Sequence, residues 1–271
     1  MNFIKKLFGI KPKQQNEIYA STITSVNLEE EFSKYVSTIT PENIEDEFSK
    51  VVAILEKYRE FTYIPEIENS ESNFSSRSKI GGFPYLMDEN GWEICPECKK
   101  QMHLFLQLNL SDLPTFDLHS SLIIQVFSCL EDFEYKLVKV ENKGKSKIID
   151  CDINQSFPEK EIIRWNKIKD YPHHEEYNII KEEFVLENEI DWLMEERQIG
   201  LCIRKDKLFG WPYWEQEARY PLKDGNNDNM KLLFQFISEE NLPFMFGDDG
   251  IFQIFYDNEI DMNLKFEWSC G

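Results

Sequence analysis

The sequence contains no run of about 18 consecutive apolar residues, the length that a membrane-spanning helix needs. Its first ten residues also lack the long apolar stretch and the small-residue cleavage site of a secretory signal. These two absences predict a cytoplasmic protein. Residues 1–20, whose short apolar stripe stops at Pro12, form either a flexible terminus or an amphipathic segment that contacts a membrane or a partner.

Cysteine and histidine are scarce as well. The six cysteines are scattered along 271 residues, and the histidines number four. This density excludes a disulfide-stapled scaffold, so we expect reduced thiols. The sequence has no Gly-x-Ser-x-Gly, His-Glu-x-x-His or protein-kinase motif. These absences favour a non-enzymatic protein, although isolated carboxylate pairs would still permit acid–base chemistry.

Basic residues are outnumbered, with 30 Lys and Arg against 50 Asp and Glu, for a formal net charge of −20. Such a surface repels nucleic-acid phosphates and anionic lipid, so we expect no nucleic acid partner and no membrane role for the protein body. It suits a basic protein or peptide, whose encounter it accelerates. The same charge could instead serve solubility alone.

Aromatic and apolar residues are plentiful by contrast. They make up 14% and 41% of the chain, which is typical of a folded protein with a sizeable core. Within residues 21–60, the segment Ser21–Lys34 recurs as Ser37–Lys50. In the second copy, apolar side chains from Ile44 to Tyr58 recur at helical spacing, which predicts an amphipathic helix of about 18 residues. We interpret residues 21–60 as a structural helical hairpin.

A longer repeat has an offset of 128 residues, the difference between positions 79 and 207. The segment Ser78–Tyr85 recurs as Asp206–Tyr213, with Lys, Gly, Pro and Tyr at matching places. Further matched pairs are Met102 with Met230, Leu104 with Leu232, Gln107 with Gln235, Gln125 with Gln253 and Phe127 with Phe255. One offset held in the same order predicts two copies of one structural unit.

The repeated unit has the pattern of β-structure. Leucines alternate across residues 104–110, which predicts a half-buried strand, and residues 231–237 are its counterpart. Segments 122–127 and 251–256 are apolar on both faces, as in central strands. The glutamines inside these strands are expected to hydrogen-bond neighbouring backbone.

The predicted fold class is therefore α+β with β dominant. Two pseudo-symmetric β-rich units, at about 75–140 and 204–268, pack together within one domain over residues 61–271. Helices from the N-terminal region and from a central stretch at about 175–198 cover the sheets.

Several ordered blocks resemble the bacterial YwqG-like family over roughly residues 60–271. In the first half these are Lys79-Ile-Gly-Gly-Phe-Pro-Tyr, Cys95-Pro-Glu-Cys98 and Met102-His-Leu-Phe-Leu-Gln-Leu. Later blocks are Asp170-Tyr-Pro172, Gly210-Trp-Pro-Tyr-Trp214, Leu233-Phe-Gln235, Met245-Phe-Gly-Asp248 and Phe266-Glu-Trp268.

The resemblance implies a duplicated β-rich fold and a protein-binding role, with no catalytic residues to carry over. The family is similar to the eukaryotic programmed-cell-death-two proteins, which are linked to ribosomal-protein chaperoning. Its bacterial members have been proposed as peptide binders, including immunity proteins. Many relatives carry cysteine pairs in both halves, whereas here Lys223 and Asn226 take their places in the second half.

Cys95-x-x-Cys98 is the candidate metal site, because two thiolates at this spacing can hold one tetrahedral ion. A structural zinc needs four ligands, and the candidates nearby in the sequence are His103, His119 and Cys129. The matching place in the second half is an ordinary turn. Zinc and a metal-free hairpin with two thiols therefore both stay open.

The partner-binding surface is predicted at the repeated turns. Lys79 and Lys207 either line one groove and neutralise a peptide carboxylate, or lie in solvent. Nearby aromatic side chains either anchor a partner or belong to the core. These candidates are Tyr85, Trp211, Tyr213 and Trp214. His173 and His174 are expected at the surface.

These observations predict a protein-binding module, immunity-like or chaperone-like, that binds a basic protein or peptide. The alternative is an enzyme whose site lies in the groove between the two repeats, with a metal held by Cys95 and Cys98.

Overall fold

The computed structural model of the chain describes residues 44–71, 73–88, 91–114, 121–148, 157–176, 188–197, 199–225, 227–257 and 262–271. Residues 1–20 and the first copy of the predicted helical hairpin lie outside this part, so those two expectations stay predictions. None of the described helices is long and apolar enough to cross a membrane.

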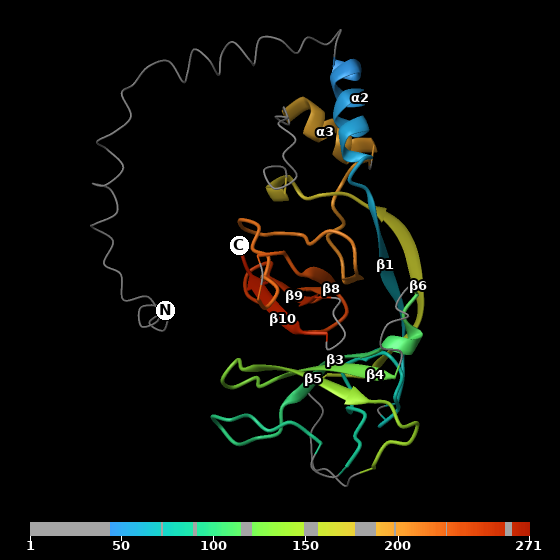
Figure 1. Cartoon of the computed structure of the whole chain (residues 1–271), viewed down its shortest axis with the longest axis vertical. Coiled ribbons are helices and arrows are strands. Elements are labelled where there is room, and N and C mark those ends of the chain that lie inside the picture. Colours follow the sequence, from blue (N-terminus) through green and yellow to red (C-terminus); the bar gives the residue numbers. More distant parts are fainter. Residues whose placement is uncertain are drawn as a thin grey trace, which may run out of the picture.

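The protein is β-dominant, as the sequence predicts (Figure 1). Ten strands form one antiparallel sheet in the order β10-β9-β8-β7-β1-β6-β2-β3-β4-β5. The strands are β1 (Glu60–Asn69), β2 (Lys79–Ile80), β3 (His103–Asn109), β4 (Leu122–Ser128), β5 (Tyr135–Glu141), β6 (Lys160–Asp170), β7 (Lys207–Leu208), β8 (Lys231–Ile237), β9 (Ile251–Tyr256) and β10 (Leu264–Ser269).

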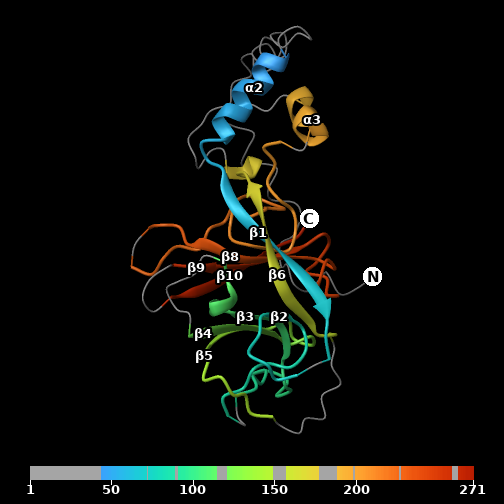
Figure 2. The same ribbon diagram turned by 90° about the vertical axis from the view of Figure 1, so that its right-hand side faces the viewer.

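The two longest strands, β1 and β6, pair along their whole length and form a ribbon at the centre of the sheet (Figure 2). β6 continues the sheet into β2, and β1 continues it into β7. We call β2–β5 with their loops, residues 73–148, the first half, and β7–β10 with their loops, residues 199–271, the second half. Each half therefore joins the sheet through a different strand of the central ribbon.

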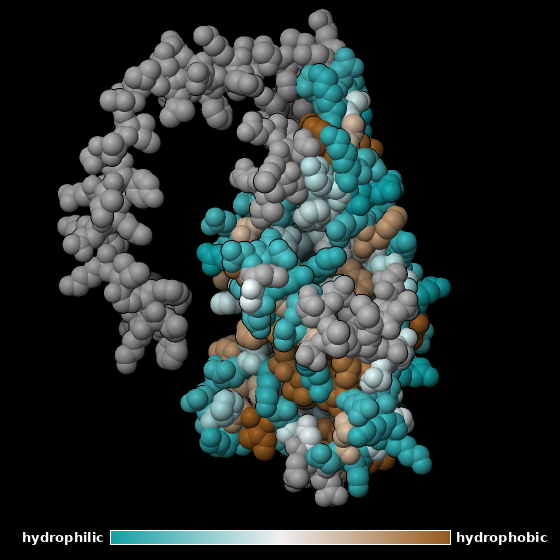
Figure 3. Space-filling view, viewed as in Figure 1, coloured by the Kyte–Doolittle hydropathy of each residue, from teal (hydrophilic) through white to brown (hydrophobic). Residues whose placement is uncertain are grey.

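The two halves face each other across a shared apolar core. The Phe105 ring lies 5.9 Å from the Phe246 ring, and Tyr135 on β5 lies 4.8 Å from Phe252 on β9. These contacts join opposite ends of the strand order, so the sheet curls on itself. The surface in Figure 3 is mostly hydrophilic, with apolar side chains near the level where the halves meet.

Strand β3 differs from its prediction. The alternating leucines indicate a half-buried strand, but every residue of β3 after His103 is buried. A bulge between Leu104 and Leu106 interrupts the alternation. Leu104 packs on the outer side beside Trp92, whereas Leu106 faces the core between the halves. Both faces are covered because the loop after β2 folds over the outer side.

The same hydrogen-bond network occurs in both halves. Gln107 Oε1 accepts from the Tyr85 N–H at 2.7 Å, and Gln125 Nε2 donates to Tyr85 O at 2.8 Å. At positions 128 further on, Gln235 Oε1 accepts from the Tyr213 N–H at 2.8 Å, and Gln253 Nε2 donates to Tyr213 O at 2.7 Å. The prediction that these buried amides bond neighbouring backbone is confirmed.

The described helices lie together beyond one end of the ribbon (Figure 1). Helix α2 (Ile44–Leu55) buries Phe48, Val51 and Leu55, and these pack with Leu193 and Met194 of α3 (Asn188–Arg197). The predicted helix ended near Tyr58, but the last three residues of that prediction form a turn. Two single 3-10 turns, η2 (Leu110–Asp112) and η3 (His174–Glu176), complete the described elements.

Candidate metal centre and neighbouring sites

The Cys-x-x-Cys segment forms a closed turn between β2 and β3. The Cys95 N–H donates to Lys100 O at 2.8 Å, and the Lys99 N–H donates to Cys95 O at 3.1 Å. Lys99 has a left-handed backbone, with φ of 62°. The turn therefore holds the Cys95 and Cys98 side chains, its first and fourth residues, on one side.

A second turn, between β4 and β5, has the same shape. The Cys129 N–H donates to Glu134 O at 2.8 Å, and the Phe133 N–H donates to Cys129 O at 2.9 Å. Phe133 is left-handed, with φ of 55°. The first and fourth residues here are Cys129 and Asp132, so this turn also presents two possible metal ligands.

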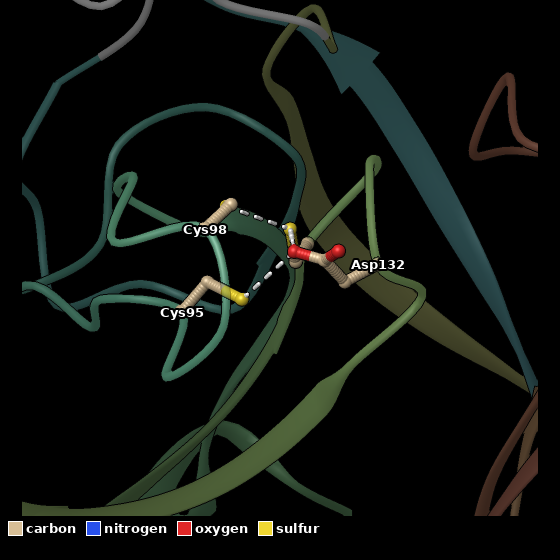
Figure 4. Close-up of side chains that lie close together, drawn as sticks. Cys95, Cys98 and Asp132 are labelled. Carbon is tan, nitrogen blue, oxygen red and sulfur yellow. Dashed lines mark hydrogen bonds between the residues drawn. The ribbon is translucent and has the colours of Figure 1, made fainter.

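The four side chains meet between the two turns, and Figure 4 shows three of them, Cys95, Cys98 and Asp132, close together. Their ligand atoms all lie within 4.8 Å of one another. Cys98 Sγ is 3.6 Å from Cys129 Sγ, and Asp132 Oδ2 is 3.4 Å from Cys95 Sγ. A tetrahedral zinc, with bonds of about 2.3 Å to sulfur and about 2.1 Å to oxygen, needs separations of about 3.8 Å and about 3.6 Å. The two measured distances are close to these values.

The donor set fits a zinc ion. Thiolates and carboxylates are both ligands that zinc accepts in proteins, and four protein ligands close a tetrahedral shell without an open position. Cys95 and Cys129 are buried, while Asp132 is exposed at the edge. A zinc held here would join the β2–β3 loop to the β4–β5 turn.

The groups around Cys98 raise the pKa of its thiol. A hydrogen bond from the Lys100 backbone lowers the pKa of the Cys98 thiol, but burial and the neighbouring Cys129, Asp132 and Cys95 raise it to about 12 overall. A thiol with such a pKa stays protonated at neutral pH. A divalent cation reverses this balance, because a coordinated thiol loses its proton.

Sequence reasoning found part of this cluster. It named Cys95 and Cys98, and it considered Cys129 as a further ligand. It missed Asp132, whose signal was the repeated spacing in Cys129-x-x-Asp132. His103 lies on β3 and is not in the cluster, and His119 is outside the described residues.

Lys79 and Lys207 are neither solvated nor open to a groove. Both are fully buried: Lys79 Nζ is 3.0 Å from Glu159 Oε2, and Lys207 Nζ is 2.9 Å from Asp170 Oδ2. Burial lowers the pKa of Lys79, and the Glu159 carboxylate opposes that shift. Both sequence-based alternatives for these lysines were wrong, because the acids at the two ends of β6 draw the ammonium groups inward.

The glycines that follow these lysines, Gly82 and Gly210, allow the carboxylates to lie close to the backbone. A Cβ atom on Gly82 would lie 2.2 Å from Glu159 Oε2, and one on Gly210 would lie 2.4 Å from Asp170 Oδ2. Both glycines also have left-handed backbone, with φ of 74° and 76°. Any other residue at either position would displace the buried carboxylate.

The four aromatic candidates divide into two groups. Tyr85 and Trp214 are buried, with 1% and 3% exposure, so they belong to the core. Trp211 and Tyr213 are partly exposed. His173 was expected at the surface, yet its ring is buried 4.4 Å from the Tyr213 ring.

That packing changes the acidity of His173. Burial, with smaller contributions from His174 and Lys207, lowers the pKa of the His173 imidazole to about 3. The side chain therefore stays neutral at physiological pH, and a catalytic acid or base with a pKa near 7 is not available there.

A cavity of about 340 Å³ opens beside Trp211 in the second half. Its wall includes the aromatic rings of Phe209, Trp211, Tyr220 and Tyr256. Glu176 also lines it, and its Oε1 accepts from Trp214 Nε1 at 2.5 Å and from the Tyr220 hydroxyl at 2.6 Å. Sequence reasoning missed Glu176, which is unremarkable in an acidic stretch.

The fold and the ligand set thus define a curled β-sheet protein with a candidate tetrahedral metal centre. The chain belongs to the family described as a domain of unknown function (DUF1963), whose model matches residues 78–268. That match starts at β2 and includes both halves of the sheet and all four candidate ligands. No curated protein matches the chain.

Proposed function

We propose that this protein is a zinc-stabilised, non-catalytic module that binds a basic protein. The convergence of Cys95, Cys98, Cys129 and Asp132 carries this proposal. Two matched turns, far apart in the sequence, place four suitable ligands around one point. Four protein ligands leave no position for substrate or water, so the ion has a structural role.

The alternative, an enzyme, has less support from the described residues. A complete ligand set does not provide the open position of a catalytic zinc. The Cys202 thiol lies 3.8 Å from the buried ammonium group of Lys207. Burial raises the pKa of Cys202 above its usual value, although Lys207 opposes this, so the thiol stays protonated and unreactive.

Protein binding is supported by charge and by exposed apolar side chains near the metal ligands. The net charge of −20 favours a basic partner. Ile94 and Phe133, which directly flank the ligands Cys95 and Asp132, are 53% and 64% exposed. A zinc ion between the two turns would hold these side chains in fixed positions. The resemblance to the YwqG-like family supports the same role.

We also propose that the two halves are copies of one unit. The paired glutamines, the buried lysine–carboxylate pairs and the glycines beside them all recur at one offset. Even the isolated bridge Ile94–Gln101 has a counterpart, Leu222–Asn229, at that offset.

Metal analysis of the purified full chain tests the zinc site. We expect one zinc per chain, and its loss in Cys98→Ser and in Asp132→Ala. Cys270→Ser is the matched control, because Cys270 is half-buried and lies outside the cluster. A zinc content unchanged by Cys98→Ser, or no zinc in the native chain, contradicts the proposal.

Affinity capture from the native lysate, at low and high salt, tests the binding role. A basic protein recovered with the chain at low salt and lost at high salt is the expected result, because salt screens exposed charges. Recovery of no partner under either condition contradicts protein binding. That outcome does not contradict the zinc site, because metal analysis tests the zinc site separately.

A further inference from the structure

The cavity in the second half has the size and lining of a ligand site. Its volume of about 340 Å³ falls within the range of about 300–1,000 Å³ that is common for ligand pockets. Trp211 is fixed on one wall, because its Nε1 donates to Tyr58 O at 2.8 Å. The Trp211 side of the wall is therefore held in place, and Phe209, Tyr220 and Tyr256 add further aromatic rings to the lining.

Glu176 supplies an unsatisfied polar group to this wall. The residue is fully buried. Both of its hydrogen-bond donors, Trp214 and Tyr220, act on Oε1, while Oε2 is buried without a partner among the described residues. A buried carboxylate oxygen without a hydrogen bond is costly, and such atoms often mark a place where a ligand binds.

The charged side chains of the cavity lining include more acids than bases. Glu60 and Lys231 both line the cavity. Desolvation raises the pKa of Glu60, and the charge of Lys231 is the largest influence that opposes this rise. The lining therefore has two acids, Glu60 and Glu176, against one lysine, and this excess of acid favours a positively charged ligand.

The first half differs at the residues that correspond to the lining of this cavity. The first-half counterparts of Trp211 and Tyr220 are Phe83 and Trp92, and Phe74 fills the space beside them. The Phe74 ring stacks on Phe83 with centroids 4.9 Å apart and meets Trp92 at 6.2 Å. At the position of Phe74 the second half has Cys202, a much smaller side chain. The space beside Phe83 and Trp92 is thus occupied by the Phe74 ring in the first half, whereas the space beside Trp211 and Tyr220 is open in the second.

We propose that this cavity receives a cationic side chain, the ammonium of a lysine or the guanidinium of an arginine, from the basic partner. The inference rests on the proposed protein-binding function. Aromatic faces attract such cations, and a carboxylate adds a charge-assisted hydrogen bond. The free Oε2 of Glu176 would accept that bond, and the rings of Trp211 and Tyr220 would flank the alkyl chain.

Small cations test the chemistry of the cavity directly. The probes are n-butylammonium and n-butylguanidinium, with n-butanol as the neutral analogue, and the readout is the indole N–H resonances of Trp211 and Trp214 in the ¹⁵N-labelled full chain. We expect saturable shifts with at least one cation, and about tenfold weaker binding of n-butanol, the effect of one charge-assisted hydrogen bond. Equal binding of n-butanol overturns the inference.

Two variants locate the site. Glu176→Gln should weaken cation binding about tenfold, whereas Glu175→Gln, the matched control on the same turn, should not change it. Asn229→Trp places a large side chain at an exposed position of the lining and should block the cavity without altering the buried carboxylate. Cation binding that persists in both Glu176→Gln and Asn229→Trp overturns the inference.

Capture of the partner separates this inference from the proposed function. If the partner's side chain occupies the cavity, Glu176→Gln should recover about tenfold less partner while it retains its zinc. If a basic partner is recovered equally by both proteins, the proposed function stands and the cavity inference fails. If the probes bind but capture does not depend on Glu176, the cavity takes a free amine, and the assignment to a partner's side chain is wrong.

Discussion

The two halves of the sheet share their buried polar groups but differ at their surfaces. Both have a lysine–carboxylate pair, a glycine pressed against that carboxylate, and a pair of glutamines bonded to a turn tyrosine. The first half adds the Cys95–Asp132 cluster and fills the space beside Trp92. The second half has Lys223 and Asn226 at the places of Cys95 and Cys98, and the space beside Trp211 is open.

The second half stabilises the equivalent turn by other means. Lys265 on β10 donates to Leu222 O and to Asp224 Oδ1, both at 2.8 Å. Its turn also keeps the first hydrogen bond of the metal-site turn, from the Lys223 N–H to Asp228 O at 2.9 Å. The shared groups therefore serve the fold. The metal-ligand cluster of the first half and the cavity beside Trp211 in the second are the places where function is expected.

Breaking the buried ion pairs should have the largest effect, and it should be equal in the two halves. Lys79→Met and Lys207→Met each leave a buried carboxylate without its counter-charge, which costs about 3–5 kcal/mol of stability. Urea unfolding measures the loss. The double variant Lys79→Met with Glu159→Leu should recover most of it. A neutral effect of either single change contradicts the equivalence of the pairs.

Removing a metal ligand in the first half should destabilise the protein more than removing the equivalent contact in the second half. Cys98→Ser, or a chelator acting on the native chain, should lower stability by about 3 kcal/mol, the contribution of a ligand present at roughly 100 times its Kd. Lys265→Met in the second half should cost less than about 1 kcal/mol, because that pair is exposed. Thermal unfolding with and without chelator gives both values. Equal losses would argue against a metal.

Opening the first half should test whether a cavity alone binds cations. Phe74→Cys, which introduces the residue found in the second half, should cost about 2 kcal/mol, below the loss for a fully buried phenylalanine. Because the Trp92 indole N–H donates to Met102 O, whereas the Trp214 indole N–H donates to the Glu176 carboxyl, n-butylammonium should not shift the Trp92 indole resonance. A shift in this variant would show that the aromatic walls suffice.

The last difference between the halves is a difference in pH dependence. Burial and then the Glu240 charge raise the pKa of Asp206 to about 8, whereas an unfolded aspartate titrates near about 3.9. The folded state favours the protonated form, so this stability is complete below about pH 4 and is lost as pH rises through about 8, by at most about 1.4 kcal/mol per pH unit.

Asp206→Ser tests this directly, because the first half has Ser78 at that position and its hydroxyl accepts from the Asn109 N–H at 3.0 Å. Urea unfolding at pH 5, 6, 7 and 8 should show a flatter profile for the variant than for the native chain. Parallel profiles would mean that Asp206 is ionised throughout this range.

The predictions from the sequence were correct where a residue type in a given pattern usually has one structural environment. Apolar runs in β4 and β9 predicted buried strands, and the glutamines within strands predicted hydrogen bonds to neighbouring backbone; both are confirmed. It failed for Lys79 and Lys207, because lysine is usually exposed and the acids that bury it lie far along the chain. Glu159 is 80 residues from Lys79.

The sequence by itself determined the β-rich character, the repeated turn motifs and the first two metal-ligand candidates, because these depend on local periodicity and spacing. Only the tertiary structure decided the rest. It brought Asp132 to the three cysteines, placed the two lysines on the acids of β6, and left Glu176 with an unpaired oxygen beside Trp211. Such contacts join residues far apart in the chain. Whether a charge is buried, paired or free depends on how the two segments that carry these residues pack together.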